Sequence, residues 1–253
     1  MNLTPLFLIN NACYQAGVPL QIRGIMLHST GANNPNLWRY VGPDDGALGS
    51  NPNNNHWNQP YPDGRSVCVH AFIGKLANGD IATYQTLPWN MRGWHSGGGA
   101  NNTHIGFEIC EDNLNDGNYF NQVYQEAAEL CAYLCKEYSL DPLGDGVLID
   151  HSEGYGRGIA SNHRDVGHWF PRYGKNMDIF RSDVHYLMTE DEHEDEHEDE
   201  DEPNPEPKPS SLEPESEPES EPKPKIISLV VNSIKRFANF ILGYLQHFRK
   251  NQR

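Results

Sequence analysis

The segment 190–225 limits how much of this chain can fold. It reads EDEHEDEHEDEDEPNPEPKPSSLEPESEPESEPKPK and contains one large aliphatic residue, Leu212. Such a segment cannot bury enough apolar surface to fold, and its charges and prolines keep it extended. We therefore expect a globular domain at 1–189, an acidic Pro-rich disordered linker at 190–225 and a separate C-terminal segment at 226–253.

The acidity of the chain is concentrated in this linker. Of the 35 Asp and Glu residues, 17 lie in 190–222, where Lys208 is the single base, and 223–253 contains seven bases and no acid. Charge segregated in this way indicates separate pieces with separate roles. His193 and His197 lie in the acidic run, but a solvated linker is favoured over a metal site there. We expect no nucleic-acid partner.

The C-terminal segment 226–253 has the pattern of a basic amphipathic helix. Its apolar residues recur every three or four positions, and the charges beside them are basic, which suits a helix lying on an anionic membrane or envelope surface. Self-association through a short coiled coil and attachment to anionic wall polymers are the alternatives. The apolar stripe consists of Ile227, Val230, Ile234, Phe237, Ile241, Leu245 and Phe248.

The cysteines and the N-terminus bear on the compartment. The number of cysteines is odd, and no CxxC pair occurs. Cys131 and Cys135 lie inside a helical pattern, where Cys behaves as a small apolar residue. We therefore expect a reduced chain made in the cytoplasm, without disulfides. The N-terminus MNLTPLFLINNACYQ lacks the basic and long apolar regions of a secretory signal.

Residues 1–189 alternate short apolar runs with longer helical patterns. The sequence predicts helices at 121–138 and 177–187, and Asn78-Gly79 predicts a hairpin turn. Strands with covering helices give an α/β or α+β domain. The Asn-, Gly- and Pro-rich stretch 31–62 is expected to be a long surface loop near the functional site. The predicted strands are 24–30, 67–73, 80–85, 104–110 and 147–150.

Two histidines and one acid lie where a catalytic metal would need them. His28 lies at the end of one apolar run, His151 directly follows another, and Asp165 lies in a polar loop. Two imidazoles and one carboxylate form a three-ligand zinc set that leaves a fourth position for water, whose pKa then falls to ~7. Spacing alone makes this a weak signal.

Seven motifs read in order are far more specific. They are LHST (27–30), VHAFI (69–73), NGDI (78–81), GWHSGG (93–98), NNTHIGFEIC (101–110), IDHSEG (149–154) and NHRDVGHWF (162–170). Over about residues 20–185 the chain resembles the zinc-dependent N-acetylmuramoyl-L-alanine amidases, a family that includes phage endolysins, bacterial autolysins and peptidoglycan recognition proteins. The resemblance implies a mixed central β-sheet flanked by helices, with zinc at the edge of a groove.

The same resemblance assigns the metal ligands. His28 and His151 match the first two zinc ligands of the family. Asp165 matches the third, an Asp or Cys in a stretch like D-P-G-x-x-F, although Val166 replaces the Pro here. His163 is the competitor for this third place, because it lies within reach and imidazole suits zinc.

Further roles follow from the remaining motifs. Glu108 matches the catalytic glutamate, which takes a proton from water and delivers it to the leaving amine. His163 matches a position that stabilises the oxyanion. Some relatives place a Tyr where this chain has Val69, so the mechanism should depend on Glu108. His95 and Trp94 are expected to contact substrate.

Three aromatic residues have a structural reading beside the functional one. Trp94 and Trp169 suit core packing as well as stacking against sugar or peptide, and His70 is expected to be buried or to support a ligand rather than to bind metal.

The resemblance predicts a zinc-dependent hydrolase that cuts the amide bond between N-acetylmuramic acid and L-alanine in peptidoglycan. With the absent signal, it suggests a bacteriolytic phage or prophage endolysin that acts on the cell wall after release from the cytoplasm. The alternatives are a cellular autolysin and a recognition module that binds peptidoglycan without cutting it.

Overall fold

The computed structural model describes residues 1–197, with side chains described up to residue 189. Within this range no helix has the length and apolarity needed to cross a membrane. Helix α4 (Met177–His197) continues into the beginning of the segment predicted as a linker. The remainder of that segment and the predicted amphipathic helix at 226–253 lie outside the described residues.

A six-stranded mixed sheet forms the centre of the domain, in the order β1-β4-β3-β5-β2-β6. All strand pairs are parallel except β3 with β4. The predicted α/β class with a mixed central sheet is confirmed. The strands are β1 (Leu3–Pro5), β2 (Gly24–Ser29), β3 (Ala71–Lys75), β4 (Ile81–Gln85), β5 (His104–Ile109) and β6 (Leu148–Asp150).

The antiparallel pair is the hairpin predicted from Asn78-Gly79. Gly79 has a φ of 92°, a left-handed conformation that glycine adopts without steric cost, whereas Asn78 does not have positive φ. The Gly79 amide donates to the carbonyl of Leu76 and closes the turn. Strand β3 begins later than predicted. The backbone of Cys68 instead forms an isolated antiparallel β-bridge with that of Trp94.

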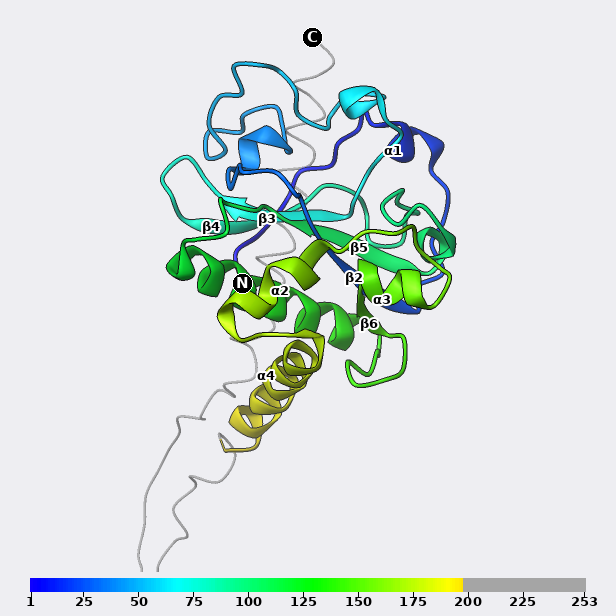
Figure 1. Ribbon diagram of the computed structural model, residues 1–253, viewed down its shortest axis with the longest axis vertical. Coiled ribbons are helices and arrows are strands. Elements are labelled where there is room, and N and C mark those ends of the chain that lie inside the picture. Colours follow the sequence, from blue (N-terminus) through cyan, green and yellow to red (C-terminus); the bar gives the residue numbers. More distant parts are fainter. Residues whose placement is uncertain (198–253) are drawn as a thin grey trace, which may run out of the picture. The chain divides into compact units, whose positions relative to one another are not determined.

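Helix α2 (Gly117–Glu137) covers one face of the sheet, with α4 packed against it (Figure 1). Asp116 caps its N-terminus by accepting hydrogen bonds from the amides of Asn118 and Tyr119. The apolar stripe of α2 packs on Ile25, Leu27 and the matching residues of β3 and β5 to form the main core. The helical periodicity therefore predicted α2 and α4 correctly, although α2 begins before residue 121.

The segment between β2 and β3 covers part of the opposite face of the sheet (Figure 1). It includes two short 3-10 turns, Leu37–Arg39 and Pro62–Gly64. Tyr40 stacks on Phe72 of β3 with ring centroids 5.2 Å apart, and Trp57 meets the same ring edge-on at 5.0 Å. This second core fixes a long loop beside the carboxyl ends of the parallel strands, where clefts form in α/β sheets.

Strand alternation assigns the polar residues to that opposite face. Along β2, Ile25 and Leu27 enter the main core, so Met26 and His28 point to the other side. Glu108 of β5 pairs with His28 in register. Strand β6 ends at Asp150, and His151 begins helix α3 (His151–Gly156) one residue later. Three strands thus bring these residues to one edge of the sheet.

A disulfide joins Cys13 of helix α1 (Ala12–Ala16) to Cys68, so the prediction of a chain without disulfides was wrong. The partners are separated by 55 positions, and they meet only because the N-terminal segment packs beside the loop before β3. No local spacing pattern reports such a contact. Cys110, Cys131 and Cys135 are free and buried, and for Cys131 and Cys135 this agrees with the helical pattern around them.

Replacing Cys13 and Cys68 by serine is expected to lower the free energy of unfolding by about 2–4 kcal/mol, because the bridge restricts the unfolded chain. Denaturant unfolding of the oxidised wild type and the double variant measures the difference. A reductant should bring the wild type to the stability of the variant and leave the variant unchanged. Equal stability of the oxidised wild type and the variant would contradict this role.

Candidate metal centre and active site

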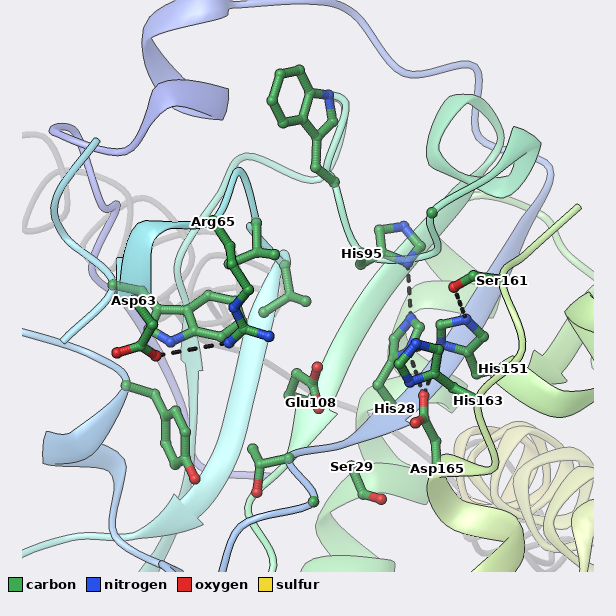
Figure 2. Close-up of a pocket in the computed structure, with 18 of the residues that line it drawn as sticks. His28, Ser29, Asp63, Arg65, His95, Glu108, His151, Ser161, His163 and Asp165 are labelled. Carbon is green, nitrogen blue, oxygen red and sulfur yellow. Dashed lines mark hydrogen bonds and ion pairs between the residues drawn. The ribbon is translucent and has the colours of Figure 1, made fainter. Parts of the chain in front are cut away.

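One pocket of about 690 Å³ lies on the face of the sheet opposite α2 (Figure 2). His28 enters it from the end of β2, Glu108 from β5, and His151 from the start of α3. Every site residue predicted from the sequence lines this pocket, namely His28, Trp94, His95, Glu108, His151, His163 and Asp165.

Three of these side chains converge on one point. Asp165 Oδ2 lies 2.8 Å from His28 Nδ1 and 2.9 Å from His151 Nδ1, and the two nitrogen atoms are 3.0 Å apart. Figure 2 shows the two rings and the carboxylate turned toward one another. Two imidazole nitrogens and a carboxylate oxygen that approach so closely repel one another unless a proton or a cation lies between them.

This donor set fits a zinc ion. Tetrahedral zinc binds nitrogen and oxygen at about 2.0–2.2 Å, which places neighbouring ligand atoms ~3.3 Å apart, so small shifts of the three side chains suffice. Three ligands leave one tetrahedral position facing the pocket, the arrangement that separates catalytic from structural zinc sites. The group comprises His28, His151 and Asp165. His163 is not part of it.

The backbone at Asp165 is strained. Its φ is +33°, at the first residue of the 3-10 turn Asp165–His168, in a region that residues with a Cβ rarely occupy. Such conformations cost about 1–3 kcal/mol and persist where the surrounding structure enforces them. The turn packs against β2 and α3, so the strained residue directs its carboxylate at the two histidines.

The protonation states suit metal binding. Burial lowers the pKa of His28 despite the attraction of Asp165. Burial alone would raise the pKa of Asp165, but the neighbouring side chains of His151 and His28 outweigh it and hold the pKa well below the usual range. A neutral imidazole and an ionised carboxylate are the forms that bind a cation without first losing a proton.

The surroundings of the Glu108 carboxylate favour its protonated form. Its Oε2 atom is shielded from solvent and finds no hydrogen-bond partner in the described part of the chain. Burial, followed by the charges of Asp165 and Glu111, raises the pKa of Glu108 well above its ordinary value. A cation at the neighbouring cluster would act in the opposite direction. A carboxylate with one unpartnered oxygen, beside a candidate metal site, is poised to exchange a proton with water.

The other predicted residues occupy different positions around this centre. His163 is exposed at the pocket edge, with its ring centroid 4.9 Å from that of His151. Trp94 is partly buried and packs against a small apolar cluster that contains the disulfide-bonded Cys13 and Cys68. His95 is also partly buried, and its Nδ1 lies 2.8 Å from His28 Nε2, so it contacts a candidate ligand directly.

Two residues for which the sequence left a functional and a structural role open, His70 and Trp169, lie inside the domain and support its packing. His70 is fully buried, and its ring nitrogens pair with the backbone of Gly106 and Met91. Trp169 is fully buried and packs on Tyr119 and Phe120 in the main core.

Sequence reasoning missed the residues across the pocket from His28, His151 and Asp165, which form the candidate ligand cluster. Asp63 and Arg65 lie across the pocket, with Glu108 between them and the histidines (Figure 2). Arg39 donates to Asp63 at 3.0 Å, whereas Arg65 lies 3.7 Å from it and has a side chain that is 63% exposed. These residues belong to the loop before β3, whose composition predicts a loop but not which side chains face the pocket.

Comparison with known proteins identifies the family. The model of the N-acetylmuramoyl-L-alanine amidase family matches residues 18–168. A search of curated proteins gives no significant match.

Solved structures share the fold at low sequence identity. The hydrolase AmiA of Staphylococcus aureus in complex with its ligand is 19% identical with a TM-score of 0.50, covering 72% of this chain and 80% of its own. The PlyG catalytic domain is 15% identical with a TM-score of 0.51, covering 74% and 96% respectively. A mutant form of PlyL is 15% identical with a TM-score of 0.50, covering 73% and 98%.

Proposed function

Because the chain belongs to the N-acetylmuramoyl-L-alanine amidase family, we propose that it hydrolyses the amide bond between N-acetylmuramic acid and L-alanine in peptidoglycan with the help of Zn²⁺. His28, His151 and Asp165 would hold the ion. When bound there, zinc would make a neighbouring water more acidic and polarise the scissile carbonyl.

The side chains of the pocket divide the remaining work. Glu108 takes a proton from the attacking water and later delivers it to the L-alanine amine as that group leaves. His163, exposed at the pocket edge beside His151, donates to the oxygen that gains negative charge. Val69 lines the same pocket and offers no hydroxyl there, so proton transfer depends on Glu108.

The observation that carries this proposal is the convergence of three metal-type ligand atoms beside the unpaired Glu108 carboxylate. The purified full chain, incubated with peptidoglycan, should release fragments with new L-alanine N-termini. A chelator should stop this release, and added zinc should restore it. New reducing sugar ends without new L-alanine N-termini would point instead to a glycosidase.

A recognition module that binds peptidoglycan without cutting it is the second candidate. Such a module requires the pocket but not the complete catalytic set, and both the ligand cluster and Glu108 are present in this chain. Co-sedimentation with peptidoglycan without any release of fragments, at saturating zinc, would favour the module over the enzyme.

The charge of the pocket indicates where the peptide lies. The carboxyl group of the muramic acid forms the scissile amide, so the free carboxylates of a muramoyl peptide belong to its peptide part. Across the pocket from His28, His151 and Asp165, Arg39 pairs closely with Asp63, whereas the Arg65 guanidinium lies farther from that acid and is largely exposed, so it can meet a substrate carboxylate. The peptide should therefore extend past Glu108 toward Arg65.

An Arg65→Gln variant is expected to raise KM about fivefold for a soluble muramoyl peptide with a free carboxylate, with little change in kcat, because an exposed ion pair contributes roughly 1 kcal/mol. Kinetics with the amidated form of the same peptide provide the comparison, since its KM should hardly change. Arg23→Gln, at an exposed position outside the pocket, is the matched control. Unchanged KM in Arg65→Gln would remove the peptide from this side.

We further propose that the enzyme is a phage or prophage endolysin, made in the cytoplasm and released onto the wall at lysis. Fractionation of producing cells should then find the protein in the cytosol until lysis begins. A steady presence in the wall fraction of intact cells would identify a cellular autolysin. Membrane contact and self-association through 226–253 stay predictions for a segment outside the described residues.

A further inference from the structure

We infer that His95 and Ser161 are positioning residues, which orient the two histidine ligands by holding their outer ring nitrogens. The inference rests on the metal-binding part of the proposed function. It revises the expectation that His95 serves substrate contact, and it gives Ser161 a role that the sequence did not suggest.

The first of two hydrogen-bond chains, called relays below, connects His28 through His95 to a backbone carbonyl. Its Nε2 lies 3.1 Å from the backbone carbonyl of His104, and its Nδ1 lies 2.8 Å from His28 Nε2. A carbonyl oxygen can only accept, so His95 Nε2 carries the hydrogen and His95 Nδ1 accepts. His28 Nε2 must then be the donor, which leaves the lone pair of His28 Nδ1 directed at the metal cluster.

The second relay runs through Ser161 and gives the same result for the other ligand. The Ser161 hydroxyl donates to the backbone carbonyl of Ser96 at 3.1 Å. Its single hydrogen is thereby used, so its oxygen accepts from His151 Nε2 at 3.2 Å. His151 Nδ1 again keeps its lone pair for the cluster. Both relays end on a backbone carbonyl, which cannot exchange the direction of its hydrogen bond.

The backbone around these relays is built to hold them. Asn101 Oδ1 accepts hydrogen bonds from the amides of both His95 and Ser96 at 2.9 Å. A Cβ at Gly106 would lie 2.4 Å from the His95 ring, so only glycine at this place in β5 leaves room for it. The GWHSGG stretch therefore supplies one relay through His95 and the end of the other through Ser96.

This geometry shows that His95 can orient the His28 ring but does not point at the candidate metal position itself. His95 Nδ1 points at the outer nitrogen of His28, whereas the cluster forms at the opposite nitrogen, Nδ1. Partners of this kind fix the tautomer and ring angle of a ligand, and their loss weakens metal binding about 10–100-fold in other metal sites.

Zinc affinity of the full chain, measured by competition with a chromophoric chelator, tests the inference. His95→Ala should bind zinc about 10–100-fold more weakly. His95→Asn should recover most of the affinity, since its carbonyl can accept from His28 Nε2. Ser161→Ala should weaken binding in the same sense, and Ser161→Thr should restore it. His185→Ala, at an exposed position on α4, is the matched control.

A second readout separates orientation from a general effect on folding. Long-range proton–nitrogen NMR spectra of the zinc-loaded wild type should show His28 and His151 protonated at Nε2. Wild-type affinity in His95→Ala would overturn the inference, as would equal losses in His95→Ala and His95→Asn accompanied by equal drops in melting temperature. A wild type that binds no zinc would instead refute the proposed metal site, and zinc binding without hydrolysis would refute the proposed activity alone.

Discussion

A Glu108→Gln variant is expected to hydrolyse muramoyl peptides about 10²–10⁴-fold more slowly than the wild type while keeping its zinc. Glutamine has the same shape but cannot accept the proton of the attacking water or return one to the leaving amine. The Oε2 atom of Glu108 has no partner among the described residues, so its replacement breaks no hydrogen bond of that atom.

Single-turnover rates on a soluble muramoyl peptide, together with metal content, measure this effect. Glu137→Gln, an exposed acid on α2 away from the pocket, is the matched control and should behave as the wild type. Retention of wild-type turnover by Glu108→Gln would remove this residue from the chemistry. Loss of zinc together with activity would make it a ligand rather than a base.

The second large effect concerns the third ligand. Asp165→Asn is expected to lose bound zinc and to reduce hydrolysis by at least about 10³-fold, because a carboxamide oxygen is a weaker ligand and an unassisted water is a far poorer nucleophile. The carboxylate lies within 3 Å of both histidine nitrogens, so no other acid can take its place without moving the backbone.

The comparison with His163 makes this prediction sharp. His163→Asn should keep its zinc and lose about 10²–10³-fold in kcat, the usual effect of removing one donor to an oxyanion. Asp165→Asn should therefore lose both zinc and activity, whereas His163→Asn should lose activity alone. The opposite outcome, with zinc lost from His163→Asn and kept by Asp165→Asn, would exchange the two assignments.

The residues that meet in the pocket could be predicted from the sequence because local patterns and the ordered motifs single them out. The apolar run that ends near His28 predicted β2, and the apolar run before His151 predicted β6. The carboxyl ends of parallel strands meet at one edge of a sheet, so these two histidines could be expected to meet. The ordered motifs added Glu108 and Asp165.

Other features escaped because they depend on contacts between distant segments. The approach of Asp165, rather than His163, to the nitrogen atoms of His28 and His151 depends on a backbone φ of +33° at Asp165, which no residue type in that stretch predicts. The partner of Cys13 is set by the packing of the N-terminal segment. The side of His95 that meets His28 depends on the space that Gly106 leaves in β5.

The sequence by itself determined the candidate site residues, which all line the pocket, because the apolar runs and the ordered motifs that single them out consist of neighbouring positions. The tertiary structure alone decided which atoms of those residues face the common point and which groups hold them there. Those relations are fixed by hydrogen bonds and close packing between segments up to 137 positions apart, and such contacts exist only once the chain has folded.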